Sequence, residues 1–203
     1  MENLIILTVK STHFYLIDGP RGRLLVDTGW AGSLPAFKSE LKRWKTDLSE
    51  IRYVMITHHH PDHAGLTQEI KNAAGARLVI HTAQIPHIKE LLAFHQKKGD
   101  ASYLPIQVTS KDIVLPSDNR DVLRALGFAG VVIETPGHSD DSVSLLLDSG
   151  LAFTGDLTLP QLAGPENETA LRESWQRLIQ GGAKTVYPAH ANPFPIDFAA
   201  MSL

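Results

Sequence analysis

The nonapeptide "THHHPDHAG" at residues 57–65 concentrates four histidines and one aspartate in a short stretch. In an extended segment His58 and His60 point to the same side, because side chains alternate with a period of two. Asp62 and His63 then begin the next turn. Two pairs of donors face one small volume, as two adjacent metal ions require. A chance H-x-H-x-D-H match in a chain of this composition is on the order of one in a thousand.

Three later motifs each place one more donor at the end of an expected strand. They are His138 in "TPGHS", Asp156 in "TGD" and His190 in "YPAH", and "DTG" repeats the pattern with Asp27. Alone, each of these histidines is more often a hydrogen-bonded polar residue than a ligand. If the strand ends meet at one edge, however, the ligand set contains five imidazoles and two carboxylates. The predicted metal ligands are His58, His60, Asp62, His63, His138, Asp156 and His190.

Other histidines and acids near these motifs are not expected to bind metal. His59 lies between two ligands and should point the other way. Asp140 and Asp141 are interpreted as turn residues. His81 and His87 are weak candidates for the rim of a pocket, and no pattern supports a role for His13 or His95.

The donors need a scaffold of strands, and the hydrophobic pattern supplies one. Strands are expected at 3–9, 14–18, 23–27, 53–57, 77–81, 112–115, 130–135, 142–148, 151–156 and 185–190. Helices are expected at 34–45, 66–75, 83–98, 119–127 and 166–182, and the stretch 83–128 is a possible lid. No linker divides the chain, so we predict one domain over residues 1–203, with packed sheets inside and helices outside.

Composition limits the function classes. The chain has no cysteine, so any metal must be held by nitrogen and oxygen. A formal net charge of −3 argues against nucleic acid as a partner. No stretch approaches the roughly 18 apolar residues of a membrane span, and "MENLIILTVK" does not have the pattern of a signal peptide. We expect a cytoplasmic protein with a small-molecule substrate; its oligomeric state stays open.

The five motifs, in this order and at this spacing, resemble those of the metallo-β-lactamase fold superfamily. The resemblance implies an α/β fold of the four-layer αβ/βα sandwich type, with a metal site at one edge of the paired sheets. By the same resemblance His58, His60 and His138 hold one metal, and Asp62, His63 and His190 hold the second. Asp156 bridges the two metals, and Asp27 is a supporting acid that orients a ligand.

Within the superfamily, the ligand set is closest to the glyoxalase II-like and lactonase-like branches, because true β-lactamases lack the bridging aspartate. Glyoxalase II proper carries a C-terminal helical extension that binds glutathione. Here only thirteen residues follow His190 (203 − 190), so a glutathione substrate is not expected.

The resemblance implies a hydrolase with two zinc ions, although iron or manganese also fits nitrogen and oxygen donors. A hydroxide shared by the ions would attack a small ester, thioester or lactone, with Asp62 as the catalytic acid or base beside it. A mononuclear iron dioxygenase acting on persulfides is the alternative, with His58, His138 and Asp156 as ligands. A non-catalytic metal-binding protein is the third reading.

Overall fold

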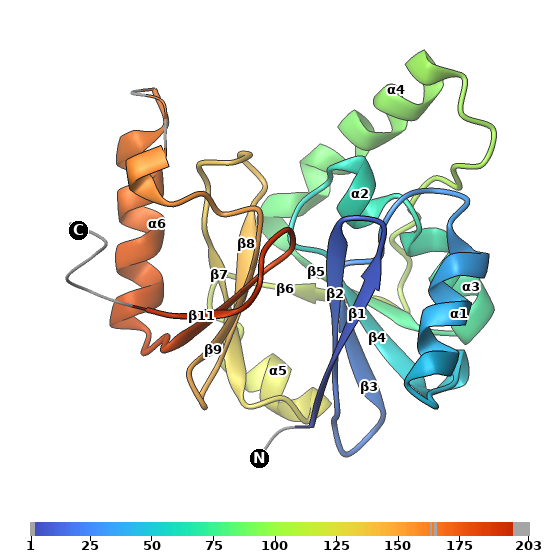
Figure 1. The fold of residues 1–203 in the computed structure, drawn as a ribbon, viewed down its shortest axis with the longest axis horizontal. Helices are drawn as coiled ribbons and strands as arrows, with labels where there is room; N and C mark the ends of the chain where they lie inside the picture. Colours follow the sequence, from blue (N-terminus) through green and yellow to red (C-terminus); the bar gives the residue numbers. More distant parts are fainter. Residues whose placement is uncertain (1–2, 163, 165, 197–203) are drawn as a thin grey trace.

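The computed structural model describes residues 3–162, 164 and 166–196, and it places two mixed sheets face to face (Figure 1). The first sheet has the order β1 (Leu4–Val9), β2 (Thr12–Ile17), β3 (Arg23–Val26), β4 (Ile51–Met55), β5 (Arg77–His81), β6 (Ile113–Leu115). The second has the order β11 (Phe194–Pro195), β10 (Thr185–Pro188), β9 (Leu151–Gly155), β8 (Val143–Leu147), β7 (Gly130–Glu134).

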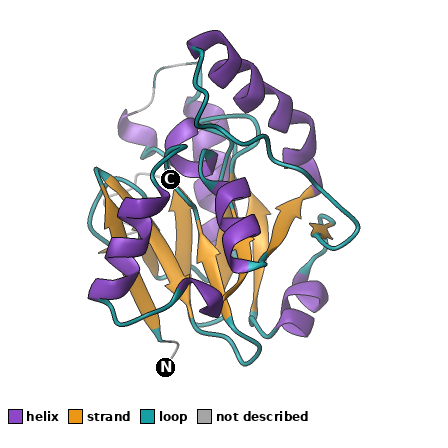
Figure 2. Cartoon of the chain, turned by 90° about the vertical axis from the view of Figure 1, so that its right-hand side faces the viewer, coloured by secondary structure: helices purple, strands orange, loops and turns teal. Residues whose placement is uncertain are grey.

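Helices cover the outer face of each sheet, which completes the four layers. Helices α1 (Leu34–Arg43) and α3 (Thr67–Ala74) flank the first sheet, and α6 (Glu168–Gln180) flanks the second (Figures 1 and 2). Helices α2 (Pro61–Ala64) and α4 (Ile88–Lys98) lie at one edge of the sheets, and α5 (Arg120–Leu126) lies at the opposite edge (Figure 1). The predicted αβ/βα sandwich is confirmed.

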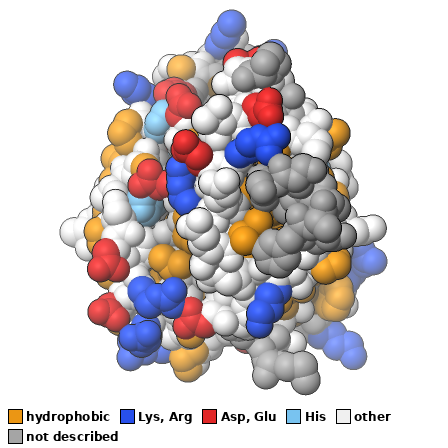
Figure 3. Space-filling view, turned by 90° about the vertical axis from the view of Figure 1, so that its left-hand side faces the viewer, with side chains coloured by type: hydrophobic (Ala, Val, Ile, Leu, Met, Phe, Trp, Pro, Cys, Tyr) orange, Lys and Arg blue, Asp and Glu red, His pale blue; other side chains and the backbone are white. Residues whose placement is uncertain are grey.

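The surface of the second outer layer is mixed in charge. On the described part of the face that α6 forms, acidic and basic side chains are interspersed (Figure 3). No helix in the described ranges is long and apolar enough to cross a membrane.

The alternation of side chains along each strand creates these layers. In β3, Leu24 and Val26 pack into the core between the sheets, whereas Leu25 packs with the α1 and α3 side. In β8, Leu146 packs with α6 while its two neighbours turn to the inner core. A strand that is buried on both faces therefore appears in the sequence as a continuous run of apolar residues.

Three details differ from the sequence-based expectation. Trp44 does not join the apolar stripe of α1; it caps the helix and is 50% exposed, while Glu40 is buried instead. The helix expected at 83–98 begins as a 3₁₀ segment, η2 (Thr82–His87), with Pro86 inside it, before α4 starts. The short strand β11 was not foreseen, and two further 3₁₀ turns are η1 (Leu48–Glu50) and η3 (Pro160–Leu162).

Strand direction brings the chemical motifs to one edge. β3 and β4 are parallel, so "DTG" and the histidine cluster follow them at the same end. β9 and β10 are also parallel, and Asp156 and His190 follow these two strands. Irregular backbone at the carboxyl ends of parallel strands is where α/β proteins commonly build their sites.

A buried ion pair anchors the irregular segment between α4 and β6. Lys71 Nζ lies 2.9 Å from Asp112 Oδ2 and also donates to the Gln107 carbonyl at 2.6 Å. Backbone amides of Thr109 and Leu78 donate to the same carboxylate at 2.8 Å each. Burial alone would raise the pKa of Asp112, but these hydrogen bonds outweigh it and lower the pKa.

We expect Asp112→Asn to reduce the free energy of unfolding by about 3 kcal/mol, because Lys71 is left buried without its counter-charge. A carboxyl whose pKa is lower in the folded state stabilises the fold above its unfolded pKa of about 3.9. That contribution disappears as the pH falls through the folded-state pKa. Urea unfolding at pH 7 and near pH 3 measures the free energy of unfolding of wild type and variant. The difference between them should be smaller near pH 3, and an equal difference at the two pH values would contradict the assignment.

Candidate metal centre

One group of three histidines forms the first half of the site. His58, His60 and His138 offer nitrogen atoms that all lie within 4.8 Å of one another. His60 Nδ1 is 3.0 Å from His58 Nε2 and 2.9 Å from His138 Nε2. The rings of this group belong to two loops that are 78 residues apart in the chain. The structure thus brings together the three residues expected to hold one ion.

The second half of the site is formed by residues of α2 and by His190, which follows β10. Asp62, His63 and His190 form another group of donors within 4.8 Å. Asp62 Oδ2 lies 3.1 Å from His190 Nε2 and 3.7 Å from His63 Nε2. Residues 61–64 form the single turn α2, which turns Asp62 and His63 back toward the sheet edge.

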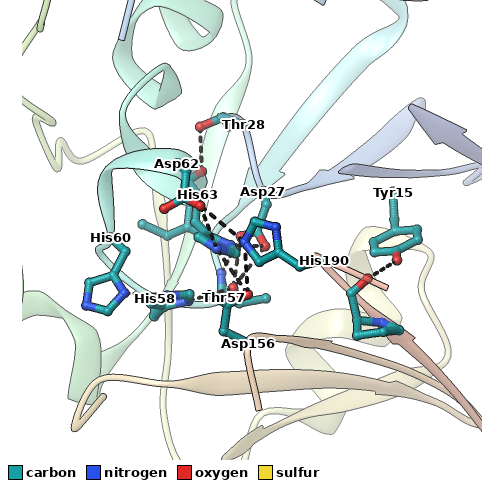
Figure 4. A network of polar contacts seen from close by, with 12 residues as sticks. Tyr15, Asp27, Thr28, Thr57, His58, His60, Asp62, His63, Asp156 and His190 are labelled. Atoms are coloured by element: carbon teal, nitrogen blue, oxygen red, sulfur yellow. Dashed lines mark hydrogen bonds and ion pairs between the residues drawn. The ribbon is translucent and has the colours of Figure 1, made fainter. Parts of the chain in front are cut away.

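Asp156 faces both groups, and its position near His63 and His190 of the second group is visible in Figure 4. Its Oδ1 is 3.3 Å from Nε2 of His63 and 3.3 Å from Nε2 of His190. Its Oδ2 is 3.5 Å from Nε2 of His138. One carboxylate oxygen is therefore directed to each group, which is the geometry of a bridging ligand.

Asp27 holds two parts of the site in place from behind. Its Oδ2 lies 2.9 Å from His63 Nδ1, and its Oδ1 accepts the Thr57 backbone amide at 2.7 Å. Thr57 Oγ1 also donates to this carboxylate. Asp27 has a positive φ of 63°, a conformation that costs energy in a residue other than glycine and is retained mainly at functional sites. Its buried carboxylate fixes the orientation of the His63 ring, as expected for a supporting acid.

The rings of His58 and His190 are also held through their Nδ1 atoms. His58 Nδ1 is 3.1 Å from Thr57 Oγ1, and His190 Nδ1 donates to the Ser11 carbonyl at 2.9 Å. With Nδ1 occupied, Nε2 of each ring is left for the centre of the site. This pattern is typical of histidines that ligate metal through Nε2.

Gly155 permits the close approach of the two sheets beside Asp156. Its φ is +56°, and a Cβ at this position would lie 2.3 Å from Thr57 Oγ1. A larger residue would push β9 away from the histidine loop, so the "TGD" motif requires glycine for contact as well as for backbone conformation.

The protonation states of the site favour cation binding. Burial, together with His63 and His60, lowers the pKa of His58 well below its usual range, so its imidazole is neutral. Burial alone would lower the pKa of His63, but Asp27 and Asp156 raise it to about 10. Burial opposes ionisation of Asp156, yet His63 and the other histidines lower its pKa and keep it anionic. Without metal, His63 is therefore protonated, and its positive charge lies among the donors that a bound cation would contact.

The donor set fits metal ions. His63 Nε2 and Asp156 Oδ1 are buried and have no hydrogen-bond partner. Unpaired buried polar atoms cost free energy, so such atoms at a convergence of imidazoles and carboxylates fit a bound cation. His58, His60 and His138 would hold one ion, Asp62, His63 and His190 the other, with Asp156 shared.

Comparison with known proteins gives the same assignment of family. Residues 7–190 match the family model described as the metallo-beta-lactamase superfamily. The chain belongs to this superfamily. A hydroxyacylglutathione hydrolase of Cereibacter sphaeroides is 30% identical over 181 residues, which are 88% of this chain and 60% of that protein. A beta-lactamase-like protein 2 homolog of Drosophila melanogaster is 24% identical over 188 residues, or 92% of this chain and again 60% of the relative.

Solved structures agree on the fold of this superfamily member. A metallo-beta-lactamase family protein from Thermus thermophilus aligns with a TM-score of 0.71 at 22% identity, covering 96% of this chain and 74% of that one. The subclass B3 enzyme BJP-1 of Bradyrhizobium japonicum aligns with a TM-score of 0.69 at 20% identity, covering 94% and 75%. The two curated relatives are longer, and the chain spans about 60% of their length.

In this superfamily member, sequence reasoning missed a clamp between the two ligand loops. Asp141 Oδ2 lies 2.7 Å from His59 Nδ1 and accepts the His59 backbone amide at 2.8 Å. Asp141 Oδ1 accepts the Ser139 hydroxyl at 2.8 Å. His59 joins neither group of donors, as expected, but Asp141 is a buried anchor rather than an ordinary turn residue. The clamp fixes the residue between His58 and His60 to the segment that follows His138.

We expect Asp141→Ala to weaken metal binding by about tenfold, because the first group of histidines loses its relative placement. Asp141→Asn, which keeps an acceptor oxygen, should fall between this variant and the wild type. Competition with a chromogenic chelator measures the affinity. Asp140→Ala is the control for metal affinity, since its exposed side chain has no part in the clamp; equal affinity losses in the Asp140 and Asp141 variants would contradict the clamp.

The remaining candidate residues are distributed around the fold. His87 borders a cavity together with His60, whereas His81 is buried at the start of η2 and borders a different surface cavity. His95 stacks on Tyr103 with ring centroids 4.0 Å apart. His13 Nδ1 pairs with Thr8 Oγ1. None of these residues joins the groups of metal donors found in the described ranges.

Two cavities flank the metal centre. One, of about 400 Å³, is bordered by His138, Asp156 and His190 and has an apolar wall that includes Leu157, Leu159 and Leu162. The other, of about 440 Å³, is bordered by His60 on the α4 side. Bound metal ions would therefore be accessible from two directions.

Proposed function

We propose that this chain is a dinuclear metal hydrolase, with zinc as the native metal, that cleaves a small ester, thioester or lactone. The observation that carries the proposal is the placement of Asp156, with one oxygen toward each group of donors. A single-ion site has no need for a carboxylate that faces two separate sets of ligands. Nitrogen and oxygen donors rich in imidazole suit zinc.

The relatives support hydrolysis of an acyl bond. One is named a hydroxyacylglutathione hydrolase, and another, from Bacillus subtilis, a probable metallo-hydrolase that is 26% identical over 226 aligned positions. Hydrolysis of an acylated thiol is cleavage of a thioester. The metal donors of this chain support the same class of reaction. We assign no particular acyl or thiol group to its substrate from these relatives.

When bound, the two ions would polarise the substrate carbonyl and lower the pKa of a metal-bound water toward about 7. The protein's own residues would hold and move the protons. Asp62 is 22% exposed and lies at the mouth of the second group, so it can accept a proton from water or pass one to the leaving group. Asp27 keeps the proton of His63 on Nδ1 and leaves Nε2 free for the metal.

The apolar cavity supports a substrate with a hydrocarbon portion. Leu157 and Leu159 follow closely after Asp156, and Leu162, which also lines the cavity, is 75% exposed. Apolar walls beside polar catalytic groups are typical of small-molecule sites. We infer that this cavity holds the apolar part of the acyl group.

Elemental analysis of freshly purified protein, followed by assays on a panel of esters, thioesters and lactones, tests the proposal. We expect about two zinc ions per chain, and turnover that a chelator removes and added zinc restores. One iron per chain, with oxygen consumed in the presence of a persulfide, would instead establish the dioxygenase alternative. Two bound zinc ions without hydrolysis of any panel member would favour a non-catalytic metal protein.

A further inference from the structure

The free edge of β1 is the least protected strand edge in the described part of the chain. β1 begins the six-stranded sheet and pairs on one side only, with β2 (Figure 1). Its residues, "LIILTV", include no charged residue, proline or glycine, and they pair with β2 without a bulge. Long, regular and apolar edges of this kind readily pair with another strand, and natural proteins usually block them.

The direction of the backbone groups in β1 follows from its pairing with β2. The Asp18 amide donates to the Asn3 carbonyl, which makes these two residues a hydrogen-bonded pair of the ladder. Hydrogen-bonded pairs alternate along an antiparallel ladder. Leu4, Ile6 and Thr8 therefore direct their N–H and C=O groups away from β2, where these groups make no backbone hydrogen bond to any other described segment.

The other edges of the two sheets are blocked or short. On β7, the Asn119 side chain accepts from the Val132 amide at 2.8 Å and donates to its carbonyl at 2.9 Å, as a neighbouring strand would. Arg177 donates to the Glu134 carbonyl at 2.7 Å at the end of the same strand. β6 has three residues, and β11 has two, one of which is Pro195. Among the described edges, β1 is therefore the exception.

We propose that β1 pairs with β1 of a second copy of this chain, antiparallel and centred on Ile6, so that the two six-stranded sheets become one. A two-fold axis runs two copies of one strand in opposite directions. With Ile6 on the axis, Leu4 lies opposite Thr8 of the partner subunit. This register pairs the outward N–H and C=O groups of all three residues, whereas a register shifted along the strand moves one of them beyond the end of the partner's β1.

The side chains and charges along this edge favour a second copy as the partner. Leu4 and Ile6 are only partly buried against the core between the sheets, and pairing brings two Ile6 side chains together across the axis. In the sequence, Glu2 precedes Ile6 by as many positions as Lys10 follows it. Because the partner strand runs in the opposite direction, the acidic end of one strand meets the basic end of the other, which is electrostatic complementarity.

Sedimentation velocity of the purified chain measures the oligomeric state. We expect a species of twice the 22.3 kDa of one chain, which dissociates in the micromolar range. Ile6→Lys places two ammonium groups across the axis and should weaken the dimer by about 100-fold or more, because like charges at an interface are strongly unfavourable. Val114→Lys is the control, since it adds the same charge to an exposed residue of β6, the other edge of this sheet.

A mixture of Ile6→Lys and Ile6→Glu distinguishes a broken interface from a damaged fold. Each variant alone should be monomeric, and the mixture should form a heterodimer because the axis then carries opposite charges. Ile6→Pro is a second test, because it removes an outward N–H group and none of the hydrogen bonds to β2. It should dissociate the dimer while the far-UV circular dichroism stays that of the wild type.

Cysteine variants test the register, because the chain has no cysteine of its own. Residues directly opposite one another in the new ladder have Cα atoms about 5.5 Å apart, whereas the two copies of Leu4 are about 14 Å apart. Dibromobimane, a short reagent that joins two thiols, should cross-link Ile6→Cys to itself and Leu4→Cys to Thr8→Cys in a mixture. Leu4→Cys alone should not cross-link.

Three results would overturn the proposal. A chain that remains at 22.3 kDa at about 100 µM forms no dimer of micromolar affinity. A dimer that persists in both Ile6→Lys and Ile6→Pro has its interface elsewhere. Cross-linking of Leu4→Cys alone, without cross-linking of Ile6→Cys, excludes the antiparallel register. These measurements require neither hydrolysis nor bound metal, so the proposed enzymatic function is tested separately.

Discussion

Replacing Asp156 with asparagine is expected to lower kcat/KM by about 10³-fold or more and to reduce the zinc content from about two ions per chain to one or fewer. The reason is that its two oxygens serve different groups, His63 and His190 on one side and His138 on the other. Asparagine keeps one oxygen and presents an N–H group in place of the second. One ion then loses an anionic ligand, and the pair can no longer share it.

Elemental analysis and thioester assays on the same preparation measure this prediction. Asp121→Asn serves as the matched control for the loss of a carboxylate, because that residue is exposed on α5, away from the site. An Asp156→Asn variant that still holds two zinc ions and turns over at the wild-type rate would disprove the bridging role. Loss of both ions would show that Asp156 organises the whole centre rather than one half.

Much of the fold was predictable because its strands and helices obey simple periodicities. The β8 run "VSLLL" is apolar on both faces, which indicates a strand covered on both sides, and Leu145 and Leu146 do face opposite layers. Helix α6 was predictable from Leu171, Trp175 and Leu178, which recur at helical spacing and are all buried. Trp44 broke the pattern because the helix ended one residue earlier and left its ring at the surface.

The site was predictable to the extent that its donors stand in short motifs. His58, His60, Asp62 and His63 are fixed by local chain geometry, so one loop and one helical turn suffice to place them. The convergence of the distant donors depended on a fold-level resemblance, because no local rule relates Asp156 to a histidine loop nearly 100 residues earlier. The grouping of all seven donors agrees with the sequence-based assignment, while their occupation by metal stays a prediction.

Contacts between loops could not be read from the sequence. His59 and Asp141 are 82 positions apart, and neither has a periodic pattern that marks it as buried. The tandem "DD" at residues 140 and 141 resembles an ordinary turn, and only packing shows that the second acid turns inward. The cavity beside His60 likewise depends on where α4 lies, which is a property of the tertiary arrangement.

Variants of the adjacent residues His60 and His59 should distinguish a metal ligand from a neighbouring histidine that does not bind metal. His60→Ala should lower zinc content to about one ion per chain and reduce turnover of every thioester to the level of the metal-free protein, since His60 Nδ1 lies within 3.0 Å of nitrogen atoms on both partners in its group. A site that loses a direct ligand binds its metal less tightly, because fewer donors hold the ion.

The adjacent residue provides a matched comparison for metal content. His59→Asn changes the imidazole next in the chain but keeps a donor for Asp141, so about two zinc ions per chain should remain bound. Zinc retained by His60→Ala but lost from His59→Asn would reverse the assignment of the two rings. Because the two side chains are consecutive and only one of them faces His58 and His138, this pair of variants tests the alternation of side chains from which the metal site was first inferred.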